Sequence, residues 1–119
     1  MKRLSKIFLI ILLLQVLLQA QGFKFGFITD THIGSPNAER DLNIVVNDIN
    51  QRPEIKFVVA TGDIAEKGLK HELSQAKDIL NQLDVPYYII PGNHDTKWTE
   101  SGGNKFKELW GYDKFSFEF

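Results

Sequence analysis

The stretch Phe57-Val-Val-Ala-Thr-Gly-Asp63 decides the fold, because a short and continuous apolar run ends there in a glycine and a carboxylate. Such a run is typical of a strand in a parallel sheet that is covered on both faces. Two neighbouring stretches have a similar form: Phe23–Thr29, with alternating aromatic residues, ends in Asp30, and Val85–Ile90 ends in Pro91-Gly92. The sequence therefore predicts three strands, each leading into a loop.

Two amphipathic helices are predicted between these strands. The apolar positions at helical spacing are Leu42, Val45, Val46 and Ile49 in the first helix and Leu69, Leu73, Ala76, Leu80 and Leu83 in the second. Turn residues at 35–37 mark the start of the first helix, Arg52-Pro53-Glu54 marks its end, and Gly68 precedes the second helix. The order β-α-β-α-β predicts an α/β fold in which helical crossovers join parallel strands.

The tail of the chain is less regular than the part before it. Residues 104–110 are compatible with one short helix, and Phe115, Phe117 and Phe119 alternate as in another strand. The sequence contains no internal repeat and no low-complexity segment.

The composition is that of a globular protein, and it excludes several functional classes. Of the 119 residues, 43% are hydrophobic and 24% are charged, which argues against a disordered chain. The absence of cysteine excludes a disulfide framework, a thiolate metal site and a cysteine nucleophile. With a net charge of −1 the chain has no large basic field, so we predict no nucleic-acid partner.

The first 22 residues have the composition of a secretory signal peptide. Met1–Lys6 is short and basic, Ile7–Leu18 is apolar apart from one glutamine, and Ala20 and Gly22 offer the small residues that a signal peptidase requires. We therefore expect an exported body, 23–119, in the periplasm or outside the cell, with no stable membrane span once the signal is cleaved. The alternative is an N-terminal membrane anchor, although crossing a bilayer takes about 20 apolar residues.

Metal-competent side chains follow all three predicted strands. Asp30 and His32 follow the first strand, Asp63 the second and Asn93 the third. Ligands of an open parallel sheet bind beyond the carboxyl ends of its strands, so these side chains are expected at one edge. Asp30 and His32 are two residues apart and would point the same way in an extended chain, and Asp63 has two oxygens that could bridge two ions. One aspartate after a strand is often a turn residue, but three such loops predict a metal site.

The donor atoms of this group indicate its chemistry. Nitrogen and oxygen ligands without sulfur favour Mn, Fe, Zn, Co or Ni over Ca or Mg. His94 lies beside the group and is predicted to be catalytic, as a general acid. Asp95, its acidic neighbour, is predicted to orient the imidazole ring.

The three motifs Asp30-x-His32, Gly62-Asp63 and Gly92-Asn93-His94-Asp95 resemble the first three motifs of the calcineurin-like metallophosphoesterase superfamily. The resemblance implies a two-sheet sandwich flanked by helices, with a centre of two divalent metal ions at one end. It implies hydrolysis of a phosphate ester, either a diester or a monoester. Bacterial secreted phosphodiesterases and phosphatases are the members that the chain resembles most in its motifs and export signal.

The resemblance also implies a role for each matching residue. Asp30 and His32 would bind the first metal ion, and Asp63 would bridge both ions. Asn93 would bind the second ion. His94 would contact the phosphate and protonate the leaving group.

The chain departs from the family pattern after the third motif. The family continues with further strands and three more histidine ligands, whereas no histidine follows His94. Purple acid phosphatases place a tyrosine three residues after the bridging aspartate, where this chain has Glu66, so that subfamily is disfavoured. We therefore expect 23–119 to be the N-terminal portion of a truncated catalytic domain, competent only in a longer protein. The alternative is a catalytically inactive fragment or a binding module.

Overall fold

The computed structural model describes residues 22–97, 103–116 and 118, so nearly all of the predicted signal segment lies outside the described residues. The order of elements is β1 (Lys24–Thr29), α2 (Ala38–Asn50), β2 (Ile55–Thr61), α3 (Lys70–Leu80), β3 (Tyr87–Ile90), α4 (Asn93–Thr96) and α5 (Asn104–Trp110). The predicted β-α-β-α-β order is confirmed, and the fold is α/β.

The three strands form one parallel sheet in the order β1-β2-β3. Thr29 at the end of β1 pairs with Thr61 at the end of β2, and Thr61 pairs with Ile90 at the end of β3. Because these last residues are in register, the three following loops begin side by side at the carboxyl edge of the sheet. This alignment places the predicted site residues at one edge.

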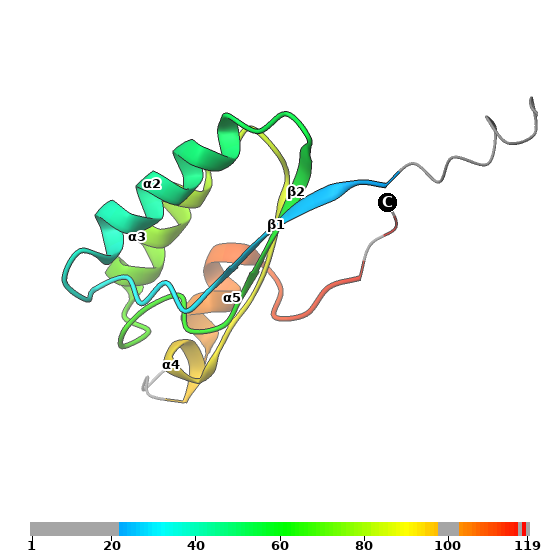
Figure 1. Cartoon of the computed structure of the whole chain (residues 1–119). Helices are drawn as coiled ribbons and strands as arrows, with labels where there is room; N and C mark the ends of the chain where they lie inside the picture. Colours follow the sequence, from blue (N-terminus) through cyan, green and yellow to red (C-terminus); the bar gives the residue numbers. More distant parts are fainter. Residues whose placement is uncertain (1–21, 98–102, 117, 119) are drawn as a thin grey trace, which may run out of the picture.

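Helices cover one face of the sheet, where α2 and α3 lie side by side (Figure 1). The core beneath them contains alternate strand residues such as Ile28, Val58 and Ile89, together with helix residues such as Val46 and Leu73. The third helix on this face, α5, contacts α3 and contributes the fully buried Phe106 to the same core.

The two predicted helical stripes are confirmed except at Val45, Leu69 and Leu83, the last of which lies beyond the end of α3 and is partly buried against the core. Leu42, Val46 and Ile49 are buried, but Val45 is 39% exposed because it lines an open hollow at the β1 edge of the sheet. Leu69 is also exposed, because it is the N-cap of α3 with an extended backbone and so precedes the helical periodicity.

The opposite face of the sheet differs from the prediction of a strand covered on both faces. Phe25 and Phe27 are exposed on this face, and no helix of the described residues packs on it. Phe57 is nonetheless buried, because the rings of Phe23, Phe25 and Tyr88 surround it. Aromatic neighbours in the same sheet layer therefore contribute to its burial.

The tail matches the prediction in its first part only. The short helix predicted over 104–110 is α5. The described residues of the predicted last strand, 115, 116 and 118, are not paired in a ladder, and Phe115 packs its ring on Tyr88 instead. Phe117 and Phe119 lie outside the described residues. Among the described residues, no helix combines the length and the apolar character that crossing a membrane requires.

Candidate metal centre

Backbone hydrogen bonds continue beyond the ends of the strands and hold the first three loops together. His32 N donates to Asp63 O at 3.0 Å, and Ile33 N donates to Ile64 O at 2.8 Å. On the other side, Gly62 N donates to the carbonyl of Ile90 at 3.0 Å. Ile33 and Ile64 are fully buried and anchor their loops in the core. The loops are therefore fixed extensions of the sheet.

Three of the predicted metal ligands have left-handed backbone conformations. The φ angles are 54° at Asp30, 45° at His32 and 47° at Asp63. Positive φ is uncommon outside glycine, and such conformations persist where the surrounding structure imposes them, often at functional sites. We expected Asp30 and His32 to point the same way because the chain would be extended there. That reason is wrong, since the chain turns at both residues.

These turns nevertheless bring the expected side chains together. Asp30, His32 and Asp63 each offer one ligand atom, and these atoms all lie within 4.8 Å of one another. Two carboxylates and one imidazole, all reachable by solvent, form a donor set that suits a divalent transition-metal ion. This grouping, with the left-handed turns that create it, is the observation on which a metal site rests.

Asn93, the predicted ligand from the third loop, is the first residue of α4 and is exposed. The preceding Gly92 touches the Asp63 loop so closely that a Cβ atom on it would lie 2.2 Å from both Asp63 N and Asp63 Oδ1. A side chain at position 92 could not be added without moving the Asp63 loop, so the backbone just before Asn93 lies against Asp63.

A second group of side chains, His32, Glu66 and His94, also has the composition of a metal site. Its geometry is better explained by hydrogen bonds. His32 Nδ1 lies 2.9 Å from Glu66 Oε2, and Ser35 Oγ donates to the same oxygen at 2.8 Å. These bonds lower the pKa of Glu66, with the Ser35 bond first and the His32 bond second, against the opposing effect of desolvation. An ionised Glu66 accepts, so His32 donates through Nδ1 and keeps the lone pair of Nε2 free for a metal ion.

Glu66 is the site residue that the sequence analysis missed. Its position in Gly-Asp-Ile-Ala-Glu66 served only to disfavour the purple acid phosphatases. The feature of the sequence that could have indicated Glu66 is its position three residues after Asp63. After the buried residues Ile64 and Ala65, the chain comes back to the site at Glu66. A carboxylate that fixes the tautomer and orientation of a metal-binding histidine is a common feature of metal sites.

The rings of His94 and His32 pack in a T-shaped arrangement, with a centroid distance of 4.8 Å and an interplanar angle of 85°. His94 Nδ1 lies 2.6 Å from the backbone carbonyl of Glu66, and because a carbonyl only accepts, Nδ1 carries a proton. This bond is the main reason that the pKa of His94 is raised, against partial desolvation, and the charges of Asp63, Glu66 and Asp95 raise it further. The proton on Nδ1 is therefore engaged by the Glu66 carbonyl, and the raised pKa favours the protonated ring.

Asp95 does not lie where the sequence analysis predicted. Its carboxylate is fully buried and accepts hydrogen bonds from the backbone amides of Ile64, Ala65 and Gly92. The ring nitrogen of His94 that Asp95 was expected to orient is bound by Glu66 O instead. Asp95 reaches His94 only through its charge, as the smallest of the effects that raise the pKa of that ring.

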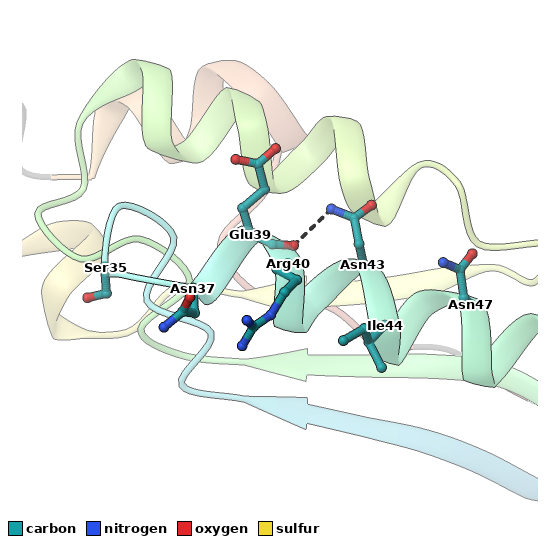
Figure 2. Close-up of a pocket in the computed structure, with 7 residues that line it drawn as sticks. All are labelled: Ser35, Asn37, Glu39, Arg40, Asn43, Ile44 and Asn47. Atoms are coloured by element: carbon teal, nitrogen blue, oxygen red, sulfur yellow. Dashed lines mark hydrogen bonds between the residues drawn. The ribbon is translucent and has the colours of Figure 1, made fainter.

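Two hollows adjoin the group and meet at Ser35. One, of about 330 Å³, lies between the end of β1 and α2 and is lined by Asp30 and His32 on one side and by Asp41, Leu42 and Val45 on the other. The second runs along α2 (Figure 2) and is lined by Ile44 and by polar residues, among them Asn43, whose Nδ2 donates to Glu39 O. The first hollow contains the metal-competent residues, so it is the one that belongs to the candidate site.

Comparison with known proteins agrees with this geometry. The profile of the calcineurin-like phosphoesterase family matches residues 23–119, which is the whole body of the chain after the predicted signal. The chain belongs to the calcineurin-like phosphoesterase family.

Curated relatives narrow the similarity to phosphodiesterases. A probable glycerophosphodiester phosphodiesterase of Arcobacter nitrofigilis is 35% identical over 97 residues, which cover 74% of this chain and 34% of the relative. A glycerophosphodiester phosphodiesterase of Enterobacter lignolyticus is 35% identical over 81 residues, covering 59% of this chain and 28% of the relative. A probable cyclic nucleotide phosphodiesterase of Rhodopseudomonas palustris is 36% identical over 83 residues, covering 62% and 30%. The chain thus spans about a third of the length of these relatives.

Proposed function

We propose that the complete protein hydrolyses phosphate esters, with diesters as the preferred class, and that it depends on two divalent transition-metal ions, which can be Mn, Fe, Zn, Co or Ni. The observation that carries the proposal is the convergence of Asp30, His32 and Asp63 at the carboxyl edge of the sheet. Family membership supports phosphoester hydrolysis, and the names of the relatives support a diester. Divalent ions would supply Lewis-acid chemistry toward the phosphate and an attacking water.

Each of these residues would have its own role in metal binding or proton transfer. Asp30 and His32 would hold one ion, Asp63 would contact both ions, and Asn93 would offer a neutral oxygen to the second. Glu66 would keep the His32 ring in the tautomer that leaves Nε2 free, because its carboxylate accepts at Nδ1. His94 would donate a proton to the departing oxygen, since its bond to Glu66 O and the nearby carboxylates raise the pKa of the ring and favour its protonated form.

Of the residues in the three motifs, Asp30, His32 and Asp63 would be the ligands of one ion, and Asp63 and Asn93 those of the other. We therefore place the activity in a longer protein and expect little or no turnover by 23–119 alone. We also retain residues 1–22 as a proposed export signal, which would place the protein in the periplasm or outside the cell. N-terminal sequencing of the protein purified from cells tests that part, since a mature N-terminus at Phe23 is expected.

The test of the function is hydrolysis of bis(p-nitrophenyl) phosphate by the complete protein. The protein is stripped of metal with a chelator and then reloaded separately with each of the five metals, and p-nitrophenyl phosphate serves as the monoester comparison. We expect chelation to abolish hydrolysis, at least one metal to restore it, and the diester to react faster. Hydrolysis that survives complete metal removal, or no hydrolysis of either ester with any of the metals, would contradict the proposal.

A further inference from the structure

The buried carboxylate of Asp95 joins two loops that come from different strands. Asp95 is 0% exposed. Its Oδ2 accepts from Ile64 N at 3.1 Å and from Gly92 N at 2.8 Å, and its Oδ1 accepts from Ala65 N at 2.9 Å. Three amide donors satisfy a charge that would otherwise be costly to bury. One side chain thus holds the loop after β2 against the loop after β3.

Asp63 makes the reverse connection. Its Oδ1 accepts from the backbone amide of His94 at 3.0 Å. The loop after β2 therefore presents a carboxylate to the backbone of the loop after β3, while the loop after β3 presents a carboxylate to the backbone of the loop after β2. We call Asp63 and Asp95, with the amides they bind, the reciprocal carboxylate pair.

Helix capping explains only one of these bonds. The bond from Gly92 N to Asp95 spans three residues and is the usual contact between an acidic N3 side chain and the N-cap amide. The bonds from Ile64 and Ala65 span 31 and 30 residues, and α4 would form its turn without them. They connect Asp95 to the two residues that directly follow Asp63 in the chain.

We infer that Asp95 is a positioning residue, which sets the Asp63 carboxylate and the His94 ring relative to each other. It does so by fixing the backbone on both sides of the contact at Gly92, where a Cβ atom would lie 2.2 Å from Asp63 N. The inference rests on the proposed function for its consequence in catalysis, but the restraint itself concerns the backbone alone. A buried carboxylate at position 95 therefore supports metal binding without touching a metal ion or a substrate.

Amide hydrogen exchange in the complete, metal-free protein tests the restraint directly. In the wild type we expect the amides of Ile64 and Ala65 to exchange slowly, although both belong to a loop. The Asp95→Asn variant keeps the size of the side chain but turns one acceptor into a donor that faces backbone amides. We expect it to speed exchange at Ile64 and Ala65 by about 10- to 100-fold, the effect of losing a hydrogen bond to a charged group. Asp84→Asn, at an exposed aspartate, serves as the control and should change neither amide.

A local effect must be separated from general unfolding. Val58 N, which donates to Pro86 O at 2.9 Å in the buried middle of the sheet, serves as the internal reference. Positioning by Asp95 predicts that exchange at Ile64 and Ala65 accelerates by a larger factor than exchange at Val58, whose acceleration reports the loss of global stability. Equal acceleration at all three amides would mean that Asp95 contributes only to global stability, and would overturn the inference. Should the variant fail to fold, the wild type decides, because exchange at Ile64 and Ala65 as fast as in exposed loops would overturn it as well.

Metal affinity provides the readout that a merely structural residue would not move. Titration of the complete protein with Mn²⁺ should show affinity about 10- to 100-fold weaker in Asp95→Asn than in the wild type or Asp84→Asn, as for other residues that orient metal ligands. If the amides of Ile64 and Ala65 exchanged faster in Asp95→Asn while its affinity for Mn²⁺ stayed unchanged, the positioning role would be overturned. Because neither exchange nor Mn²⁺ titration uses a phosphate ester, both remain valid even if the protein hydrolyses none.

Discussion

The loops after β2 and β3 each contain an aspartate, and the two side chains differ in their exposure to solvent. Asp63 is half-buried, with its carboxylate reachable from solvent and near the ligand atoms of Asp30 and His32. Asp95 is fully buried, and three backbone amides occupy its carboxylate. The comparison teaches that access decides what a carboxylate does: an open one can bind a metal ion, whereas an enclosed one holds the backbone in place.

The largest effect on activity is expected at the open carboxylate. Asp63→Asn keeps an oxygen that can accept from His94 N, and asparagine tolerates the positive φ at this position, so the fold should persist. The charge that the metal ions require is lost. Changes at residues that only orient ligands cost about 10- to 100-fold, so we expect at least about a 100-fold loss of metal-dependent hydrolysis in the complete protein. Near wild-type turnover of bis(p-nitrophenyl) phosphate would refute the assignment of Asp63.

The enclosed carboxylate should instead dominate stability. Asp95→Ala leaves the buried amides of Ile64 and Ala65 without an acceptor, and each orphaned donor costs about 1–3 kcal/mol. We therefore expect the free energy of unfolding, measured by urea denaturation, to fall by about 2–6 kcal/mol. Asp84→Ala, at an exposed position, should stay within about 0.5 kcal/mol of the wild type. Equal stability of the two variants would remove the distinction between the open and the enclosed aspartate.

The contact between the loops after β2 and β3 can be tested by substituting Gly92. In Gly92→Ala the added Cβ would meet Asp63 N and Asp63 Oδ1, so the loops must move apart. Overpacking of this kind costs about 1–3 kcal/mol, and thermal denaturation measures it. Gly111→Ala is the comparison, because it introduces a side chain at a positive φ of 78° but meets nothing within 4 Å. A smaller loss at position 92 than at position 111 would show that the loops are not in tight contact.

The smallest effect is expected at the edge of the network. Ser35→Ala removes one of the two hydrogen bonds to Glu66 Oε2 and leaves the bond to His32 in place. The His32 ring should therefore keep its orientation, and we expect hydrolysis to fall by less than about 10-fold, the lower end for residues that support metal ligands. Ser74→Ala, at a position in α3 away from the site, is the matched control. A loss at Ser35 as large as that in Asp63→Asn would mean that Glu66 depends on Ser35 alone.

The sequence predicted the fold well because two periodic patterns determine it. Continuous apolar runs and helical stripes place β1 to β3, α2 and α3, and register in a parallel sheet then aligns the three loops. The departures occur where periodicity does not apply. Leu69 is a cap outside its helix, and the last strand was expected from alternating phenylalanines although Phe115 packs on Tyr88.

The candidate site was predictable in its members but not in its geometry. Spacing and strand ends indicated Asp30, His32 and Asp63, yet the left-handed turns that join them were not predicted, because Asp and His tolerate positive φ without requiring it. The different environments of Asp95 and Asp63 were not predictable either, because Asp95 is enclosed by the amides of Ile64 and Ala65, which lie about 30 residues away in the chain. Such contacts depend on two loops meeting in space, which the order of residues in one loop does not reveal.

The most direct test of the metal centre is Mn²⁺ binding to the complete protein, measured by electron paramagnetic resonance for the wild type and Asp63→Asn side by side. The spectra report bound and free Mn²⁺ without any substrate, and Asp84→Asn controls for the loss of one negative charge. We expect the wild type and Asp84→Asn to bind with equal affinity and Asp63→Asn to bind at least about 100-fold more weakly. Equal binding by all three proteins would contradict a metal centre built around Asp63.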